Sequence, residues 1–304
     1  MKNSGFAAFI ITYERTEILL KTISAIKNQT FPPAYLLIID NSLSNYTEKA
    51  LQEYISDSFE YYRVGYNSGP AGGANIGLEK LTNLGYDWIY WGDDNNPPRD
   101  LNVFQEMFEA LQDFEAAKEN PGILGGKGGD LNKLTGRLRS LSNKKLLEKK
   151  FAEVDVIPGG HTMIVNSRVI AAGCLPDEKL FFGFEEMDFC LKVKKAGFNL
   201  FVDSQTWLKI RRRDSHFEEN YRWKDSGFGK KEAIKRDYYS SRNLLDIFYK
   251  NKMFPAFAIL LLKCLGKSLL SFRFGWNYGK AMAKAQFSAV IHFFSGKFGK
   301  QVEL

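Results

Sequence analysis

The sequence predicts an α/β protein with a mixed, mostly parallel sheet flanked by helices, followed by a C-terminal helical extension. Three observations support this fold class. Short apolar runs alternate with segments of helical spacing in the first half, polar residues stand directly after those runs, and the pattern is helical from Lys235 onward. Apolar residues make up 44% and charged residues 25% of the 304 residues, a globular composition that excludes disorder as the main state.

The first half of the chain predicts βαβ units. The expected strands are 6–11, 35–39, 61–64 and 88–91, and the expected helices are 16–28, 46–55 and 74–84. Strands that are separated by helices pair in parallel, and ligands of such sheets bind beyond the carboxyl ends of the strands. We therefore expect a binding site near Asp40, Asn67 and Asp93, which follow or end these runs.

The second half is less regular. The Gly- and Lys-rich stretch 120–150 predicts a loop or hairpin, and Arg211–Arg213 predicts a charged loop. The remaining expected elements are strands at 154–157, 162–165 and 199–202 and a helix at 186–196, which Gly197 would terminate.

Cysteine usage and apolar runs limit the class of protein. Cys174, Cys190 and Cys264 form no C-x-x-C pair, so we expect neither a zinc ribbon nor a disulfide framework, and we expect a cytoplasmic protein. We find no signal-peptide pattern at the start and no run of about 18 uninterrupted apolar residues, so no transmembrane helix is predicted.

Basic charge is concentrated at the end of the chain. From residue 248 onward nine Lys and Arg residues face one acidic residue, whereas the total surplus is +7. Because these bases are mixed with Phe, Leu, Ile and Trp, they predict contact with an anionic membrane surface rather than with nucleic acid. A solvated lysine face on packed helices, or a homo-oligomer interface, would give the same pattern.

The sharpest polar motif is Asp93-Asp94-Asn95 at the end of an apolar run. Two adjacent carboxylates there favour a hard divalent ion, which prefers oxygen ligands and is often shared with substrate phosphates. An acidic turn is the alternative.

Two further motifs could bind a ligand or transfer a proton. The segment Asn67–Gly77 is rich in glycine and enters a helix, which suits close approach to a phosphate, although it matches neither a dinucleotide nor a P-loop motif and could be a plain turn. Glu185, Glu186 and Asp188 stand at the start of a helix, where carboxylates either cap the helix or serve as a general base.

Together these segments resemble the family 2 glycosyltransferases, which have a GT-A fold, over residues 6–202, about two thirds of the chain. The resemblance rests on five motifs: Ile11-Thr12-Tyr13-Glu14-Arg15, Ile39-Asp40-Asn41-Ser42, Asn67–Gly77, Asp93-Asp94-Asn95 and the stretch from Gly173 to Asp188. Tyr238–Asn243 is similar to a motif of rhamnosyl- and galactofuranosyltransferase-like members. Gly92 stands where the family often has a first acid, and Glu185-Glu186 stands where Glu-Asp is common.

The resemblance implies roles for particular residues. Asp94 would bind a divalent metal, Mn²⁺ or Mg²⁺, with His216 as a second ligand, and Glu186 would be the base, with Glu185 and Asp188 as alternatives. The residues expected to bind the nucleotide sugar are Thr12, Glu14, Arg15, Asp40, Asn67, Gly69, Gly72, Gly73 and Asp93. His161 could reach the acceptor, although a strand-edge position explains it equally well, and Trp91 could stack on a sugar, although core packing is the default explanation for it.

The sequence therefore predicts an inverting, metal-dependent glycosyltransferase. It would move a UDP- or dTDP-linked sugar, such as galactofuranose, rhamnose or galactose, to a glycan or lipid-linked glycan at the inner face of the membrane. We expect a catalytic domain at 1–235, divided near residue 120 into nucleotide-sugar and acceptor halves, and a helical extension at 236–304. A sugar nucleotidyltransferase is the enzymatic alternative, although its glycine-rich loop is absent after the first strand. A non-catalytic nucleotide-fold module at the membrane is the other.

Overall fold

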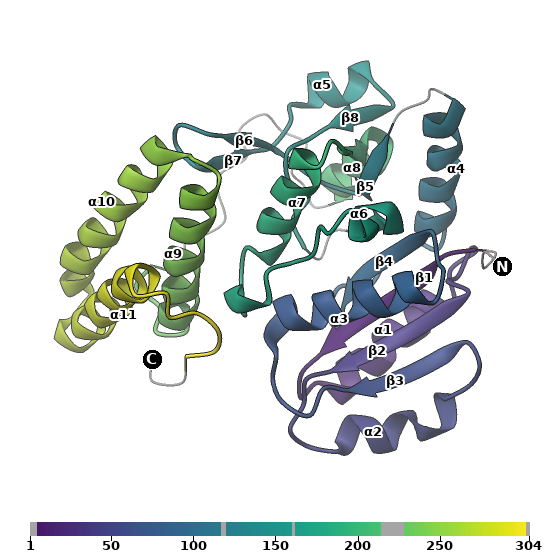
Figure 1. Ribbon diagram of the computed structural model, residues 1–304, viewed down its shortest axis with the longest axis horizontal. Coiled ribbons are helices and arrows are strands. Elements are labelled where there is room, and N and C mark those ends of the chain that lie inside the picture. The colour runs from purple at the N-terminus through teal and green to yellow at the C-terminus, as the bar shows by residue number, and fades with distance from the viewer. Residues whose placement is uncertain (1–4, 117–119, 160–161, 214–227, 302–304) are drawn as a thin grey trace.

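The computed structural model describes residues 5–116, 120–159, 162–213 and 228–301. Figure 1 shows a central sheet with helices on both faces, and three helices packed together at the C-terminal end of the chain. The predicted α/β class with a C-terminal helical extension is confirmed.

The first four strands form the parallel half of an eight-stranded sheet. They are β1 (Ala7–Thr12), β2 (Tyr35–Asp40), β3 (Phe59–Arg63) and β4 (Trp88–Asp93), and they stand in the order β3-β2-β1-β4. The connecting helices are α1 (Thr16–Lys27), α2 (Tyr46–Leu51), which continues as a short 3-10 turn (Gln52–Tyr54), and α3 (Gly69–Asn83). Because helices cover both faces, β1, β2 and β4 are apolar over most of their length, whereas the edge strand β3 is only partly buried.

The second half extends the same sheet in the order β9-β5-β10-β8. These strands are β5 (Pro121–Gly125), β8 (Phe151–Glu153), β9 (Met163–Asn166) and β10 (Asn199–Asp203). β9 is antiparallel to both β4 and β5, and it joins the two halves into one mixed sheet. A separate hairpin is formed by β6 (Asp130–Asn132) and β7 (Arg137–Arg139), as expected for part of the stretch 120–150.

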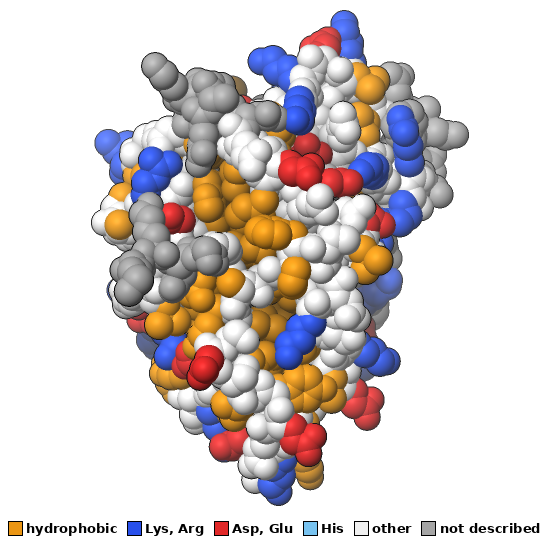
Figure 2. Space-filling model, turned by 90° about the vertical axis from the view of Figure 1, so that its right-hand side faces the viewer, with side chains coloured by type: hydrophobic (Ala, Val, Ile, Leu, Met, Phe, Trp, Pro, Cys, Tyr) orange, Lys and Arg blue, Asp and Glu red, His pale blue; other side chains and the backbone are white. Residues whose placement is uncertain are grey.

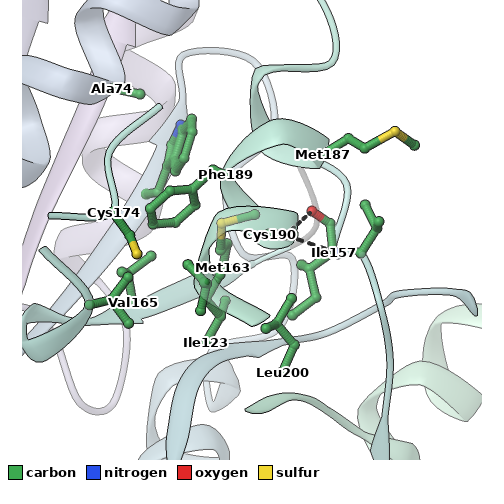
Figure 3. Close-up of a cluster of buried hydrophobic side chains, with 14 of the residues drawn as sticks. Ala74, Ile123, Ile157, Met163, Val165, Cys174, Met187, Phe189, Cys190 and Leu200 are labelled. Atoms are coloured by element: carbon green, nitrogen blue, oxygen red, sulfur yellow. Dashed lines mark hydrogen bonds between the residues drawn. The ribbon is translucent and has the colours of Figure 1, made fainter. Parts of the chain in front are cut away.

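The helices of the second half cover both faces of the sheet. α4 (Val103–Ala116) joins α1 on one face, while α6 (Ser167–Ala171) and α7 (Glu185–Lys195) join α3 on the other. Figure 3 shows how α7 is anchored: Phe189 and Cys190 lie among Ile157, Met163 and other buried side chains. The two remaining helices of this half are α5 (Asn143–Glu148) and α8 (Ser204–Arg213). A buried apolar helix face thus fixes the position of the acidic residues at the start of α7.

Helices α9 (Ala233–Lys250), α10 (Phe254–Leu270) and α11 (Trp276–Phe294) pack against one another, with a 3-10 turn (Ser271–Phe274) between the last two. α9 also contacts the α/β part of the molecule, since Ile247 and Phe248 belong to the main core. The expected boundary at residue 235 falls inside the first turn of α9, and the division into two domains stays a prediction.

Three expected elements are wrong. The glycine-rich segment is not a loop before the helix, because α3 begins at Gly69, with Pro70 in its first turn. Residues 154–157 form no strand apart from one isolated bridge, and the strand lies at Phe151–Glu153 instead. Arg211–Arg213 ends helix α8, where the Arg211 guanidinium donates to Leu141 and Ser140.

Aromatic side chains close the end of the sheet opposite to the carboxyl ends of β1 and β4. Phe6 and Phe108 both contact the half-exposed Phe31, with ring centroids 5.6 Å and 5.3 Å from it. On the side of the molecule where the chain begins, Figure 2 shows hydrophobic side chains gathered in the middle, with charged side chains around them. The polar cleft described below lies at the other end of these strands.

Candidate active site

The carboxyl ends of β1 and β4 bring the predicted acidic pair next to three polar side chains. Ile11 of β1 pairs with Asp93 of β4, so Asp94 lies beside the end of β1. The Asp94 carboxylate accepts from the Thr12 hydroxyl at 2.9 Å and from Arg15 at 3.3 Å, and the Thr22 hydroxyl donates to its carbonyl at 2.5 Å. Asp94 is thereby fixed at the edge of the sheet, with only 5% of its surface exposed.

These residues open into a cleft of about 830 Å³. Its walls include the strand edge, the start of α3, the segment before α7 and the beginning of α9. The predicted site residues among its lining are Thr12, Arg15, Asn67, Gly69, Trp91, Asp93, Asp94, Glu185 and Glu186. The two acidic pairs, which lie almost a hundred residues apart in sequence, thus face the same space.

Glu185 and Glu186 follow a tight segment that the backbone holds in place. Phe181 and Phe184 have positive φ angles of 64° and 69°, which are uncommon for bulky residues and indicate a constrained segment. The Phe181 carbonyl leaves no room for a Cβ on Gly69, which would lie 2.1 Å from it. The start of α3 and the acidic segment are therefore in direct contact across the cleft.

Glu186 has the properties of a base. Burial raises the pKa of Glu186 to about 7, and the nearby charge of Asp93 raises it further. The backbone N–H of Gly159 donates to the carboxylate, which lowers the pKa and partly offsets these effects. A Cβ on Gly159 would lie 1.8 Å from Glu186 Oε1, so only glycine permits this contact. The close approach explains why a glycine stands at position 159.

Two other acids of the cleft, Asp93 and Glu185, also have raised pKa values. Burial raises the pKa of Asp93 to about 6, with a further contribution from Asp94 and opposition from Arg15. Burial and the charge of Glu186 raise the pKa of Glu185 well above its usual range, and Glu185 Oε2 has no hydrogen-bond partner within the described ranges. Crowded carboxylates at a cleft wall are typical of functional sites and need a cation or a proton to be stable.

Helix α9 holds the segment before α7 in place. The Asn243 amide donates to the carbonyls of Leu180, Phe182 and Gly183 at 3.0, 3.0 and 2.8 Å. The fully buried Arg242 donates to the Leu180 carbonyl at 2.9 Å. The sequence pointed to Tyr238–Asn243 only through a resemblance, and no local pattern could reveal that its target lies sixty residues earlier.

Several predicted residues occupy supporting positions outside the cleft lining. Asp188 is buried and pairs with Lys192 at 2.6 Å, while Asp40 accepts from the Tyr61 hydroxyl and from the backbone of Ser42, both at 2.8 Å. Glu14 binds the backbone N–H groups of Leu43 and Ser44. Gly72 and Gly73 lie inside α3, where Gly73 packs against Ile11. His161 and His216 lie outside the described residues.

Sequence reasoning overlooked other residues of the cleft. Thr22 is a helical residue that supports Asp94 from the side, and Gly159 supports Glu186. Lys235, Arg236 and Lys300 line the cleft from the C-terminal part of the chain. Lys300 belongs to the basic stretch that begins at residue 248, whereas no sequence pattern pointed to Lys235 or Arg236.

The oxygen donors suit a divalent cation. In the part of the chain that the structure describes, no group of three His, Cys, Asp or Glu side chains forms a complete metal cluster. Asp94 nevertheless presents a nearly buried carboxylate beside Asp93, whose pKa is raised by burial and by the charge of Asp94, so a cation here would offset two neighbouring negative charges. Mg²⁺ is commonly bound through one or two carboxylates together with substrate phosphates, so the residues present fit such an ion.

The mixed sheet, with its acidic edge and the cleft at the carboxyl ends of its strands, is the GT-A fold of glycosyltransferases. Solved structures share it. GalNAc-T7 with UDP, GalNAc and Mn²⁺ is 14% identical, with a TM-score of 0.53 over 66% of this chain and 42% of that one. A mannosyltransferase of Pyrobaculum calidifontis in complex with GDP-Man and Mn²⁺ is 11% identical, with a TM-score of 0.53 over 96% of this chain and 87% of that one.

The family model described as glycosyl transferase family 2 matches residues 7–168, and the chain belongs to this family. The galactofuranosyltransferase GlfT1 of Mycolicibacterium smegmatis is 23% identical over 203 residues, which are 62% of this chain and 65% of the relative. GlfT1 of Mycobacterium tuberculosis strain H37Rv is 23% identical over 210 residues, 65% of this chain and 66% of the relative. The match thus spans just under two thirds of these relatives.

Proposed function

We propose that the chain is an inverting, metal-dependent glycosyltransferase that uses a nucleoside-diphosphate sugar and a hydroxyl acceptor. One observation carries the proposal: the acidic strand edge and the acidic start of α7 line one cleft. A sugar held between them would have its diphosphate on the Asp94 side and its acceptor on the Glu186 side. That arrangement is the one required for direct displacement with inversion at the sugar carbon.

The donor side binds and orients the diphosphate. Thr12, Arg15 and Asn67 line the cleft near the acidic edge, and Arg15 can pair with phosphate oxygens once it leaves Asp94. Asp94 would hold the divalent ion, with His216 as the second predicted ligand. When bound, such an ion neutralises the charge that develops on a departing diphosphate.

On the acceptor side, Glu186 takes the proton. The acceptor oxygen forms a bond to the anomeric carbon, the bond from that carbon to the diphosphate oxygen breaks, and its electron pair leaves with the diphosphate. The acceptor proton passes to the Glu186 carboxylate. A pKa of about 7 suits this role, because the ideal base has a pKa close to the working pH.

The test is donor binding followed by transfer. We expect a UDP- or dTDP-linked sugar with Mn²⁺ or Mg²⁺ to raise the melting temperature, because a ligand that binds only the native state stabilises it. Glu186→Gln should reduce transfer by roughly 10³-fold while sparing donor binding. If the Gln variant keeps near wild-type transfer, Glu186 is not the base. Formation of a nucleotide sugar from a sugar phosphate would instead favour a nucleotidyltransferase, and binding without turnover a non-catalytic module.

For the sugar, we infer galactofuranose as the first donor to test. The support is that both relatives named above are described as galactofuranosyltransferases. Rhamnose and galactose are the other candidates, and the acceptor would be a glycan or lipid-linked glycan of cell-surface polysaccharide synthesis.

We also propose that α10 and α11 rest on an anionic lipid surface at the inner face of the membrane. Leu262 and Leu269, two helical turns apart on α10, are 69% and 65% exposed, and Ile291 and Phe294 of α11 are 61% and 67% exposed. Lysines such as Lys263 and Lys280 stand among these apolar residues. Apolar side chains between lysines match the chemistry of an anionic bilayer surface.

By length and composition alone, the segment Phe254–Phe274, which comprises α10 and the 3-10 turn after it, could cross a membrane. Contacts with the rest of the protein favour the interfacial position, since α10 packs on α9 and α11 and Lys267 pairs with Asp237 of α9 at 3.0 Å.

Vesicle binding tests the lipid surface. The double variant Leu262→Ser/Leu269→Ser should reduce binding to vesicles containing phosphatidylglycerol. The matched control Leu134→Ser/Leu147→Ser changes two leucines outside the bundle that are each 66% exposed. Equal vesicle binding by both double variants would overturn the proposal. A change in oligomeric state confined to the α10 variant would show that a second copy covers this face.

A further inference from the structure

The C-terminal part of the chain lines the cleft with basic side chains. Lys235 and Arg236 come from the first turn of α9, and Lys300 comes from the segment after α11. All three side chains are exposed, and among the described residues none of them has an ion-pair partner. Three cations without an ion pair among the described residues therefore share a cleft with five carboxylates, those of Asp93, Asp94, Glu185, Glu186 and Glu232.

Lys300 reaches the cleft because the segment Phe298–Gln301 folds back onto the catalytic half. The Gly299 N–H donates to the Lys179 carbonyl at 2.7 Å, and the Gln301 N–H donates to the Tyr239 hydroxyl at 2.9 Å. These bonds attach the segment both to the acidic side of the cleft and to α9.

Arg242 secures the same segment from inside. Its buried guanidinium donates to the Gly299 carbonyl at 2.9 Å, and it lies 5.2 Å from the centre of the Phe298 ring. The same guanidinium binds the Leu180 carbonyl ahead of the acidic pair. The buried Arg242 thus connects the C-terminal segment 298–301 to the segment that precedes Glu186. This connection fixes the position of Lys300 at the cleft.

We propose that Lys235, Arg236 and Lys300 form a diphosphate-binding subsite in this cleft. Lone cations among carboxylates would pair with them, yet these three have no carboxylate partner in the described structure. Several cations that converge without partners are suited to a polyvalent anion such as a diphosphate.

The proposal rests on the proposed function only for the source of the diphosphate. Two substrates of such a transferase carry this group: the nucleotide sugar and a lipid diphosphate-linked acceptor. Both would present the same chemistry to the three side chains, and the experiment below distinguishes them.

The first experiment measures the affinity of inorganic pyrophosphate by calorimetry without added metal. The triple variant Lys235→Ala/Arg236→Ala/Lys300→Ala should bind it at least tenfold more weakly than the wild type. The control variant Lys231→Ala/Lys297→Ala removes exposed lysines next to the subsite residues in sequence but outside the cleft lining, and it should bind normally. Equal affinities in the wild type and the triple variant, or no binding by the wild type, would overturn the proposal.

A second set of measurements identifies the source. If the donor occupies the subsite, affinity for UDP or dTDP with Mn²⁺ should fall in the triple variant, while affinity for the free nucleoside stays the same. If the acceptor occupies it, nucleotide affinity should stay the same, while affinity for farnesyl diphosphate falls and affinity for farnesol does not. Loss of transfer in Glu186→Gln leaves pyrophosphate binding intact, so failure of the proposed reaction and failure of this subsite are separable.

Discussion

The two acidic pairs of the cleft are held in different ways. Asp93 and Asp94 are supported by side chains from the first βα unit of the chain, Thr12, Arg15 and Thr22. Glu185 and Glu186 are supported through the backbone, by Gly159 and by the carbonyl groups that Asn243 binds. The proposed donor side is therefore built from neighbouring parts of the sheet, whereas the proposed acceptor side depends on the C-terminal helices.

Removing the charge of Asp94 is expected to have the largest effect. Asp94→Asn keeps the size of the side chain but weakens both the pairing with Arg15 and any binding of a divalent ion. We expect transfer to fall by roughly 10³-fold, because the departing diphosphate loses its neutralising cation. Metal-dependent binding of the nucleoside diphosphate should be lost in the same variant, as measured by calorimetry with and without Mn²⁺.

Asp57→Asn is the control for this variant, because Asp57 is exposed and lies away from the cleft. If Asp94→Asn still binds the nucleotide in a metal-dependent way, Asp94 does not hold the metal ion. The edge formed by Asp93 and Asp94 would then not be the donor side of the cleft.

The dependence of the acceptor side on α9 can be tested through Asn243. Asn243→Ala leaves three carbonyls ahead of the acidic pair without their donor, which should cost about 2 kcal/mol or more of unfolding free energy. We expect kcat to fall roughly 100-fold, because Glu186 is no longer held at the reacting geometry. The KM for the donor should change little, since the donor side keeps its own supports.

Asn251→Ala is the matched control, because this amide at the C-cap of the same helix donates to the Ile247 carbonyl and not to the acidic segment. A rise in donor KM equal to the fall in kcat would show that α9 supports the whole cleft rather than one wall.

The same contrast explains what the sequence could predict. The strand ends at Thr12, Asp40 and Asp94 follow from apolar runs and polar residues that are close together in the chain, and those expectations match the observed strand edge. The contacts of Gly159, Asn243 and Lys300 join residues that are distant in sequence, and no local periodicity encodes them. The central strand β5 was also unpredicted, because Pro121-Gly122 resembles a loop although packing makes it a strand.

Gly159 offers a smaller and more local change to the acceptor side. A Cβ at this position would collide with Glu186 Oε1, so Gly159→Ala must displace the carboxylate or the turn. We expect about a tenfold loss of transfer with unchanged nucleotide affinity. Gly173→Ala is not a suitable control because its φ of 80° disfavours any side chain, whereas Gly266→Ala on α10 meets open space. Equal transfer in Gly159→Ala and Gly266→Ala would show that Glu186 does not need its present position.

The smallest expected effect is the pH dependence of stability, which depends on the raised pKa of Glu186. Burial raises this pKa from its ordinary value of 4.5 to about 7, so the folded chain binds this proton more tightly than the unfolded chain does. The stability that this group contributes is complete below pH 4.5 and declines as the pH rises to about 7. Asp93, with its pKa of about 6, acts in the same direction over a lower range.

Glu186→Gln removes the contribution of Glu186 while keeping the shape of the side chain. Between pH 4.5 and pH 7.5, the melting temperature of the variant should therefore decline less than that of the wild type, by roughly 5 °C at this chain length. Differential scanning calorimetry in the presence of a metal chelator measures this difference without interference from bound cations. If the melting temperatures of the two proteins decline equally with pH, the pKa of Glu186 is not raised in the folded protein. The proposed acceptor side would then lack a base whose pKa lies near the working pH.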